Sequence, residues 1–131
     1  MAEKKRALVV DDEEGIREFI REVLEEEGWE VLLAEDGVQA WALATVPNRL
    51  LHVIISDIQM PKKDGIVLLK ELKSDARLSS IPVILLTGIR EKAGISFTKE
   101  GIGDTLGTEP SAYLEKPVTP QELLKAVRSL A

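Results

Sequence analysis

The stretch RALVVDD at residues 6–12 runs from a short apolar segment directly into two carboxylates. An apolar run of this length, rich in valine, predicts a fully buried strand over residues 6–11. The next segment, 14–27, has apolar residues at helical spacing and predicts an amphipathic helix that ends at Gly28. A buried strand followed at once by an amphipathic helix is typical of an α/β fold.

The same order of elements recurs along the chain. Further strands are predicted over 30–34, 51–57, 82–87 and 113–115. Helices are predicted over 38–46, over 65–75 and from a capping box at Thr119 and Glu122 onward. Strands that alternate with helices indicate a five-stranded parallel sheet with helices on both faces. The whole chain, 1–131, is expected to form a single domain.

The stretch 88–111 departs from this pattern because it contains five of the nine glycines. A glycine inside a helix costs about 1 kcal/mol relative to alanine. We therefore expect a short helix around 89–93 and then an irregular, glycine-rich segment in place of a regular fourth helix. This segment is expected to be mobile or specific to a partner.

Composition narrows the possible functions. The chain has no cysteine, which excludes disulfides and thiolate chemistry. Its net charge of −6 argues against nonspecific nucleic-acid binding. No apolar stretch approaches the length of a membrane span, and the apolar run after the basic N-terminus is too short for a signal peptide. The cytoplasm is therefore the expected location.

Polar side chains follow the predicted strands where each strand ends. Asp11 and Asp12 follow the first strand, Asp57 ends the third, Thr87 ends the fourth and Lys116 follows the fifth. Parallel strands bring these groups to one edge of the sheet, where open α/β sheets bind ligands. Carboxylates favour Mg²⁺, whereas an amine and a hydroxyl favour an anion. A site with both is suited to phosphoryl chemistry.

Each of these residues also has a structural interpretation. Asp11 or Asp12 could cap the first helix, and Asp64 is best interpreted as the N-cap of the third. Thr87 alone would more often be an ordinary strand residue, and Lys116 alone a solvated lysine. The single histidine, His52, lies at the start of its strand, away from the predicted site, and is therefore interpreted as structural.

The order and spacing of these residues along the chain, taken together, point to a protein family. Asp57 is followed by Met60-Pro61 and Asp64-Gly65, and Tyr113 precedes Lys116-Pro117. With Asp11, Asp12 and Thr87, the chain resembles the receiver domain of two-component response regulators over residues 6–130. The resemblance implies a flavodoxin-like, doubly wound (βα)5 fold with strand order 2-1-3-4-5. It also implies a cis peptide bond between Lys116 and Pro117.

The resemblance also implies a role for each residue. Asp57 would be the phosphoacceptor, and Mg²⁺ would be bound by Asp12, Asp57 and the backbone carbonyl of Gln59, with Asp11 acting through water. Lys116 and Thr87 would contact phosphoryl oxygens. The metal and Lys116 would keep the pKa of Asp57 low.

The family further implies a signalling domain rather than an enzyme. The phosphodonor would be a sensor histidine kinase or phosphotransfer protein, and the output would pass to an effector protein or a fused output domain. Thr87 and Tyr113 would move on phosphorylation and change a protein-binding face. The expected assembly is a monomer or a weak homodimer. Thr87 and Lys116 are 29 positions apart in the sequence, which is more than the family usually shows.

Two other functions would require different residues at these positions. A hydrolase of the haloacid dehalogenase type would need a second aspartate where this chain has Gln59. A flavin-binding domain would need a phosphate loop near the first strand, where residues 11–14 are all acidic and would repel phosphate. A receiver that never accepts phosphate is a milder alternative, which the intact set of five residues disfavours.

Overall fold

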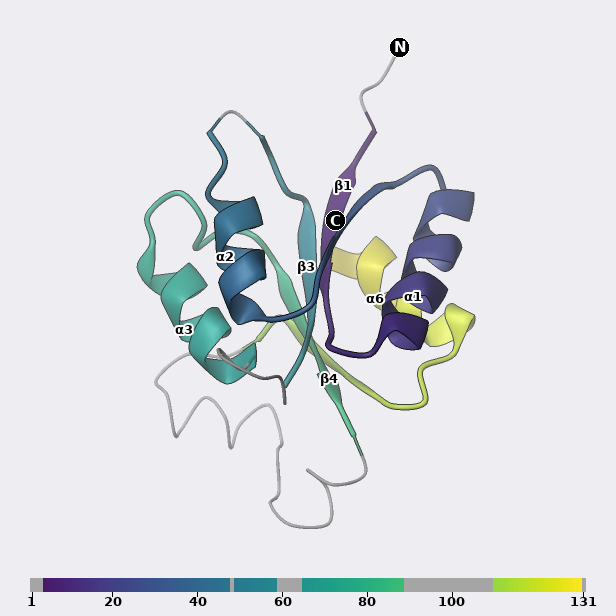
Figure 1. Cartoon of the computed structure of the whole chain (residues 1–131). Helices are drawn as coiled ribbons and strands as arrows, with labels where there is room; N and C mark the ends of the chain where they lie inside the picture. The colour runs from purple at the N-terminus through teal and green to yellow at the C-terminus, as the bar shows by residue number, and fades with distance from the viewer. Residues whose placement is uncertain (1–3, 48, 59–64, 89–109, 131) are drawn as a thin grey trace.

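The protein folds as a three-layer α/β structure (Figure 1). The computed structural model describes residues 4–47, 49–58, 65–88 and 110–130. The predicted irregularity of 88–111 lies mostly outside these residues, as do Gln59, Met60, Pro61 and Asp64. Within the described part of the chain, no helix is long and apolar enough to cross a membrane.

Five parallel strands form one sheet in the order β2-β1-β3-β4-β5. This confirms the predicted fold class and strand order. The bounds agree with the sequence prediction to within two residues: β1 Arg6–Val10, β2 Glu30–Ala34, β3 Val53–Asp57, β4 Val83–Thr87 and β5 Ala112–Glu115.

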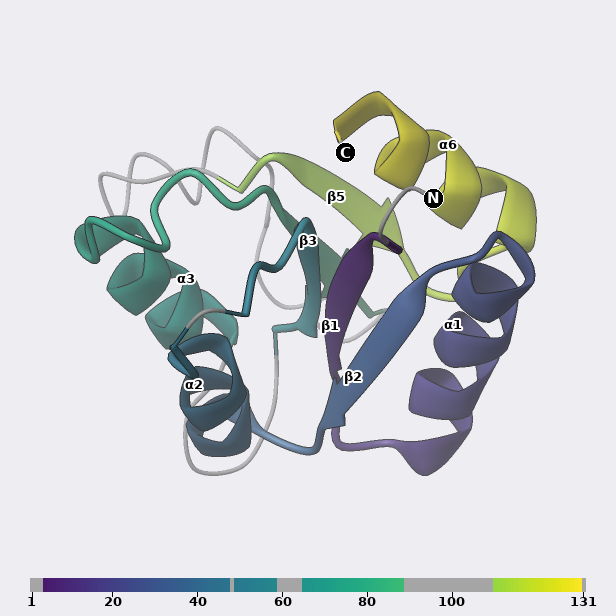
Figure 2. The same cartoon turned by 90° about the horizontal axis from the view of Figure 1, so that it is seen from above.

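Helices cover both faces of the sheet, as Figure 2 shows from above. The first core contains Leu8, Ile54 and Leu85 and lies under α2 (Gly37–Ala44) and α3 (Gly65–Ser74). The second contains Val9 and Ile55, on the opposite face, and lies under α1 (Glu14–Glu26) and α6 (Pro120–Leu130). β3 and β4 are buried along their whole length, which explains their continuous apolar runs.

Local signals in the sequence explain the element ends. Gly28 follows α1 with φ of 89°, a left-handed conformation that glycine adopts without strain. The capping box before α6 is formed, because Glu122 N–H donates to Thr119 Oγ1 at 3.1 Å and Thr119 N–H donates to Glu122 Oε1 at 3.4 Å. His52 accepts a hydrogen bond at Nδ1 from Arg6 N–H at 3.0 Å, which supports its structural role.

Gly65, at the start of α3, holds this helix directly against the end of β3. Its N–H donates to the Ile58 carbonyl at 2.8 Å. A Cβ at this position would overlap the Asp57 carbonyl oxygen and lie 3.0 Å from the Asp57 carbonyl carbon. Only glycine allows this approach, which fixes the backbone that carries Asp57.

Gly65→Ala is therefore expected to lower the free energy of unfolding by about 2 kcal/mol or more, because backbone atoms must shift. Gly15→Ala in α1 is the matched control. Nothing lies within 4 Å of a Cβ at that position, so we expect a change between zero and about 0.5 kcal/mol of stabilisation. Urea denaturation measures both, and equal effects of the two substitutions would contradict the packing argument.

Candidate functional site

Parallel register brings the predicted polar residues to one edge of the sheet. Val10 lies beside Ser56, Asp57 beside Leu86 and Thr87 beside Glu115, so the carboxyl ends of the strands are nearly level. Asp11 is 0% exposed, Asp57 5% and Thr87 4%. Buried polar groups at adjacent strand ends are costly unless they have partners, so this cluster needs a specific explanation.

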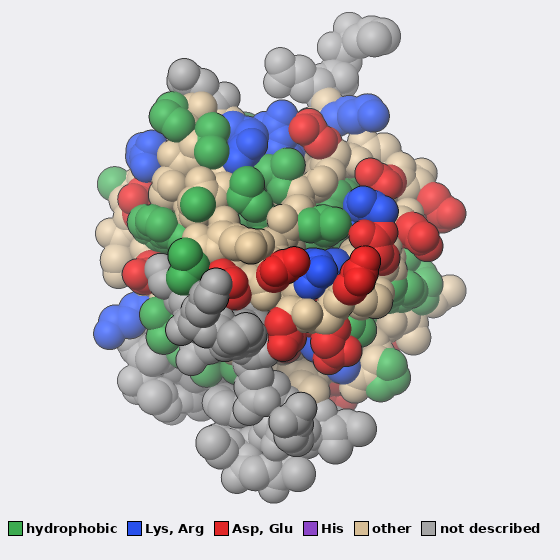
Figure 3. Space-filling model, in the orientation of Figure 1, with side chains coloured by type: hydrophobic (Ala, Val, Ile, Leu, Met, Phe, Trp, Pro, Cys, Tyr) green, Lys and Arg blue, Asp and Glu red, His purple; other side chains and the backbone are tan. Residues whose placement is uncertain are grey.

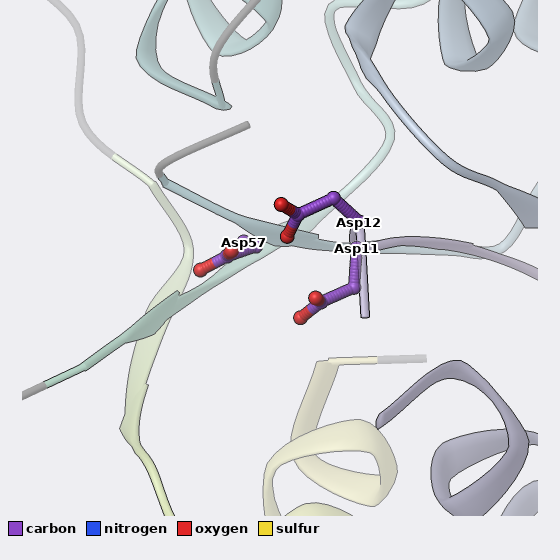
Figure 4. A group of neighbouring side chains, drawn as sticks. All are labelled: Asp11, Asp12 and Asp57. Atoms are coloured by element: carbon purple, nitrogen blue, oxygen red, sulfur yellow. The ribbon is translucent and has the colours of Figure 1, made fainter. Parts of the chain in front are cut away.

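Three carboxylates form the centre of the site (Figure 4). One oxygen each from Asp11, Asp12 and Asp57 lie within 4.8 Å of one another. Oxygen ligands at this spacing suit a hard divalent cation such as Mg²⁺, with water completing the shell. The residues therefore fit the metal that the sequence predicts.

Lys116 contributes the ammonium of the site. Its Nζ lies 3.0 Å from Asp11 Oδ2 and 3.3 Å from Asp57 Oδ1, and its side chain is 17% exposed. Its backbone N–H donates to the Thr87 carbonyl at 2.7 Å, which anchors the end of β5 to β4. The predicted cis peptide bond between Lys116 and Pro117 is present. Two carboxylates contact this ammonium and that of Asp12 lies beside them, so a further cation at the site is electrostatically favourable.

Backbone donors orient the two buried carboxylates. Ile58 N–H donates to Asp57 Oδ1 and Glu13 N–H to Asp11 Oδ1, each at 2.9 Å. Glu13 is the N-cap of α1 and its side chain makes no capping bond. The alternative in which Asp11 or Asp12 caps this helix is therefore not what the structure shows.

Burial dominates the ionisation of Asp57. Desolvation, and then the nearby charge of Asp11, raise its pKa to about 7, although Lys116 and the Ile58 N–H oppose this. Lys116 does lower this pKa, as the sequence interpretation expects, but in the protein without metal one ammonium does not offset burial beside a second carboxylate.

Burial also affects the ionisation of Asp11 and Lys116. Desolvation also raises the pKa of Asp11, despite hydrogen bonds from Glu13 and Lys116. Burial alone would lower the pKa of Lys116, but the two aspartates outweigh it and the pKa is raised. The ammonium is therefore retained at neutral pH.

Sequence reasoning missed three contributors to the site. Arg17 Nη1 donates to the Asp11 carbonyl at 2.7 Å from α1, the Ile58 N–H binds Asp57, and Gly65 allows α3 to approach. The position of Arg17 could have suggested its role, because it lies in the first turn of the helix that follows the acidic pair. Tyr113 on β5 lies beside Leu85 on β4. Its side chain is partly buried and packs against the core under α2 and α3.

Asp57→Asn is expected to stabilise the metal-free protein in a pH-dependent way. Because the folded pKa is raised above the ordinary value of 3.8, the folded state binds more protons between about pH 4 and 7, and wild-type stability falls across that window. The variant lacks this loss, so its advantage should be small near pH 4 and on the order of 4 kcal/mol at pH 8.

Urea denaturation in EDTA at several pH values measures this difference. Glu26→Gln, on the exposed end of α1, controls for the loss of a negative charge alone. A stability difference between wild type and Asp57→Asn that is the same at pH 4 and pH 8 would contradict the raised pKa.

Comparison with known proteins identifies the family. Residues 7–128 match the model of the response regulator receiver domain. The chain is 39% identical to the response regulator Rre1 of Synechocystis over 134 aligned residues, which cover 99% of this chain but 53% of that protein. It is 38% identical to the chemotaxis protein CheY1 of Helicobacter pylori, with 90% of each chain covered.

Solved structures agree with this result. The chemotaxis protein CheY4 of Vibrio cholerae superposes with a TM-score of 0.82 at 30% identity, covering 98% of this chain and 100% of that one. A putative response regulator of Chloroflexus aurantiacus gives a TM-score of 0.81 at 28% identity, covering 98% of each. The chain therefore spans about half of one relative and nearly all of others, and it belongs to the response regulator receiver domain family.

Proposed function

We propose that this chain is a phosphorylation-switched signalling domain in which Asp57 accepts a phosphoryl group. The observation that supports this most directly is the Asp57 carboxylate, buried beside Asp11 and Asp12 and contacted by Lys116. Asp57 Oδ1 is held by the Ile58 N–H and Lys116. A fixed carboxylate with a cation beside it is suited to attack an incoming phosphorus atom.

Asp11, Asp12 and Asp57 would hold Mg²⁺, together with the backbone carbonyl of Gln59, which lies outside the described residues. When bound, the metal supplies positive charge that keeps Asp57 ionised and offsets the charge of the phosphoryl oxygens. Asp11 Oδ2 contacts Lys116 Nζ directly, so its first role is to position that ammonium.

In the transfer, an oxygen of Asp57 forms a bond to phosphorus while the bond between phosphorus and the donor's imidazole nitrogen breaks. The leaving nitrogen keeps the bonding electron pair. Because the other ring nitrogen of the donor already carries a proton, the imidazole leaves as a neutral molecule. Lys116 Nζ and the hydroxyl of Thr87, which ends the neighbouring strand, would contact phosphoryl oxygens, which carry the charge in the transition state.

The proposed partners follow from this chemistry. A sensor histidine kinase or a phosphotransfer protein would supply the phosphohistidine in the cytoplasm. The added charge would favour an active conformation in which Thr87 and Tyr113 move, and an effector protein or output domain would bind it. The protein itself turns over no external substrate in this proposal, and it acts as a monomer or a weak homodimer.

The first test is intact-mass analysis after incubation with acetyl phosphate or phosphoramidate and Mg²⁺. We expect the wild type to gain one phosphoryl group from either donor, because phosphoramidate presents the same kind of phosphorus–nitrogen bond as phosphohistidine. Asp57→Asn and wild type in EDTA should gain none.

Other outcomes would count against the proposal. Phosphoryl gain on both wild type and Asp57→Asn would mean a different acceptor. No gain on either, with Mg²⁺ binding confirmed separately, would indicate an interaction module that does not depend on phosphorylation. Sustained release of phosphate from an external ester would favour the hydrolase.

Mg²⁺ affinity should depend on pH. Because the metal binds ionised carboxylates and the pKa of Asp57 without metal is about 7, the fraction of protein ready to bind rises as pH increases. The dissociation constant for Mg²⁺ should be about tenfold larger at pH 6 than at pH 8. Isothermal titration calorimetry measures this, and an affinity that does not change with pH would contradict the proposed role of Asp57 as a ligand.

A further inference from the structure

An open pocket of about 350 Å³ lies at the end of the sheet opposite the carboxylates. It is formed by the end of α2, by residues 49–51 before β3 and by residues 77–81 before β4. Its floor is apolar and buried, since Leu51 is 3% exposed and Leu78 and Ile81 are each 6% exposed. These segments precede the strands, whereas the proposed phosphorylation site follows them.

Exposed apolar side chains gather on the same helical layer. In the part of the chain that the structure describes, the large hydrophobic residues that remain exposed all belong to α2, the loop after it or α3: Val38, Val46, Leu50 and Val67. Leu50 is 66% exposed and Val46 38%, and both line the pocket. Val46 and Leu50 therefore add exposed apolar surface to a pocket with an apolar floor, which is typical of an interaction site.

Basic side chains surround this pocket. Arg49 and Arg77 line it, Arg6 Nη1 donates to the Leu50 carbonyl and Lys73 Nζ donates to the Ile81 carbonyl, the last two at 3.1 Å. In Figure 3 blue side chains lie beside green ones at the top of the molecule, and red ones gather lower on this face.

Two of these four cations have a carboxylate partner. Arg6 pairs with Glu30 and Arg77 with Asp75, whereas Arg49 and Lys73 contact no carboxylate within the described residues. The pocket is therefore locally positive on a chain whose net charge is −6. An acidic ligand is repelled by most of this protein and attracted to this place, which gives specificity through charge.

We propose that this pocket is a docking site for an acidic amphipathic segment of a partner protein. An apolar side chain of the segment enters between Leu50 and the buried floor, and its carboxylates contact Arg49 and Arg77. This is the helix-in-groove mode of recognition with charge complementarity at the rim. Because the pocket lies at the opposite end of the sheet from Asp57, docking is constitutive and does not require phosphorylation.

The test uses the full chain and pools of random seven-residue peptides. One pool contains leucine and glutamate, a second leucine and glutamine, and a third leucine and lysine. We expect the acidic pool to shift backbone amide NMR signals in residues 44–51 and 77–81, and the basic pool to leave them unchanged. Asp57→Asn should bind the acidic pool as the wild type does.

Variants separate the pocket from general surface effects. Leu50→Glu and Arg77→Glu both change exposed side chains, so the fold should persist. Each should weaken binding of the acidic pool at least tenfold. Val38→Glu is the matched control, because Val38 is exposed on the same layer but does not line the pocket, and it should change binding less than twofold.

Several results would overturn the proposal. These are no shift with the acidic pool, equal shifts with the basic pool, or equal binding by Leu50→Glu and wild type. Shifts that depend on protein concentration without peptide would assign the pocket to a second copy of this chain. Saturation by decanoate with no response to the acidic pool would assign it to a small amphiphile.

Discussion

The site depends on one electrostatic constraint, which is that two buried carboxylates share one ammonium while a third carboxylate lies beside them at the surface. Lys116 contacts Asp11 at 3.0 Å and Asp57 at 3.3 Å, and Asp12 completes the acidic group. Parallel strands make this possible, because their carboxyl ends meet at one edge. The excess negative charge makes a further cation at the site electrostatically favourable, and together with burial it raises the pKa of Asp57 to about 7.

This arrangement opposes the stability of the fold. A carboxyl group whose pKa is raised by burial stabilises the folded state only while it is protonated. The surrounding structure compensates with fixed backbone contacts, including the Ile58 N–H on Asp57 and the close approach of α3 at Gly65. A buried carboxyl group whose raised pKa lowers the stability of the fold is typical of functional sites.

The two ends of the sheet differ in chemistry. The carboxyl end carries buried acids and is suited to metal and phosphoryl groups. The amino end, next to α2 and α3, carries an apolar pocket with basic side chains around it and is suited to an acidic protein segment. Under the two proposals, separation of these features along the strands would let the chain bind a partner and accept a phosphoryl group at different places.

The sequence by itself determined the five strands, their order and the convergence of Asp11, Asp12, Asp57, Thr87 and Lys116, because apolar periodicity and residue order are local and the family motifs are specific. Tertiary structure alone decided the ionisation of Asp57, the need for glycine at Gly65 and the pairing of Lys116 with Asp11. It also decided the pocket, whose residues 49–51 and 77–81 are distant in sequence. Burial and long-range contacts set these properties, and neither is encoded in the spacing of neighbouring residues.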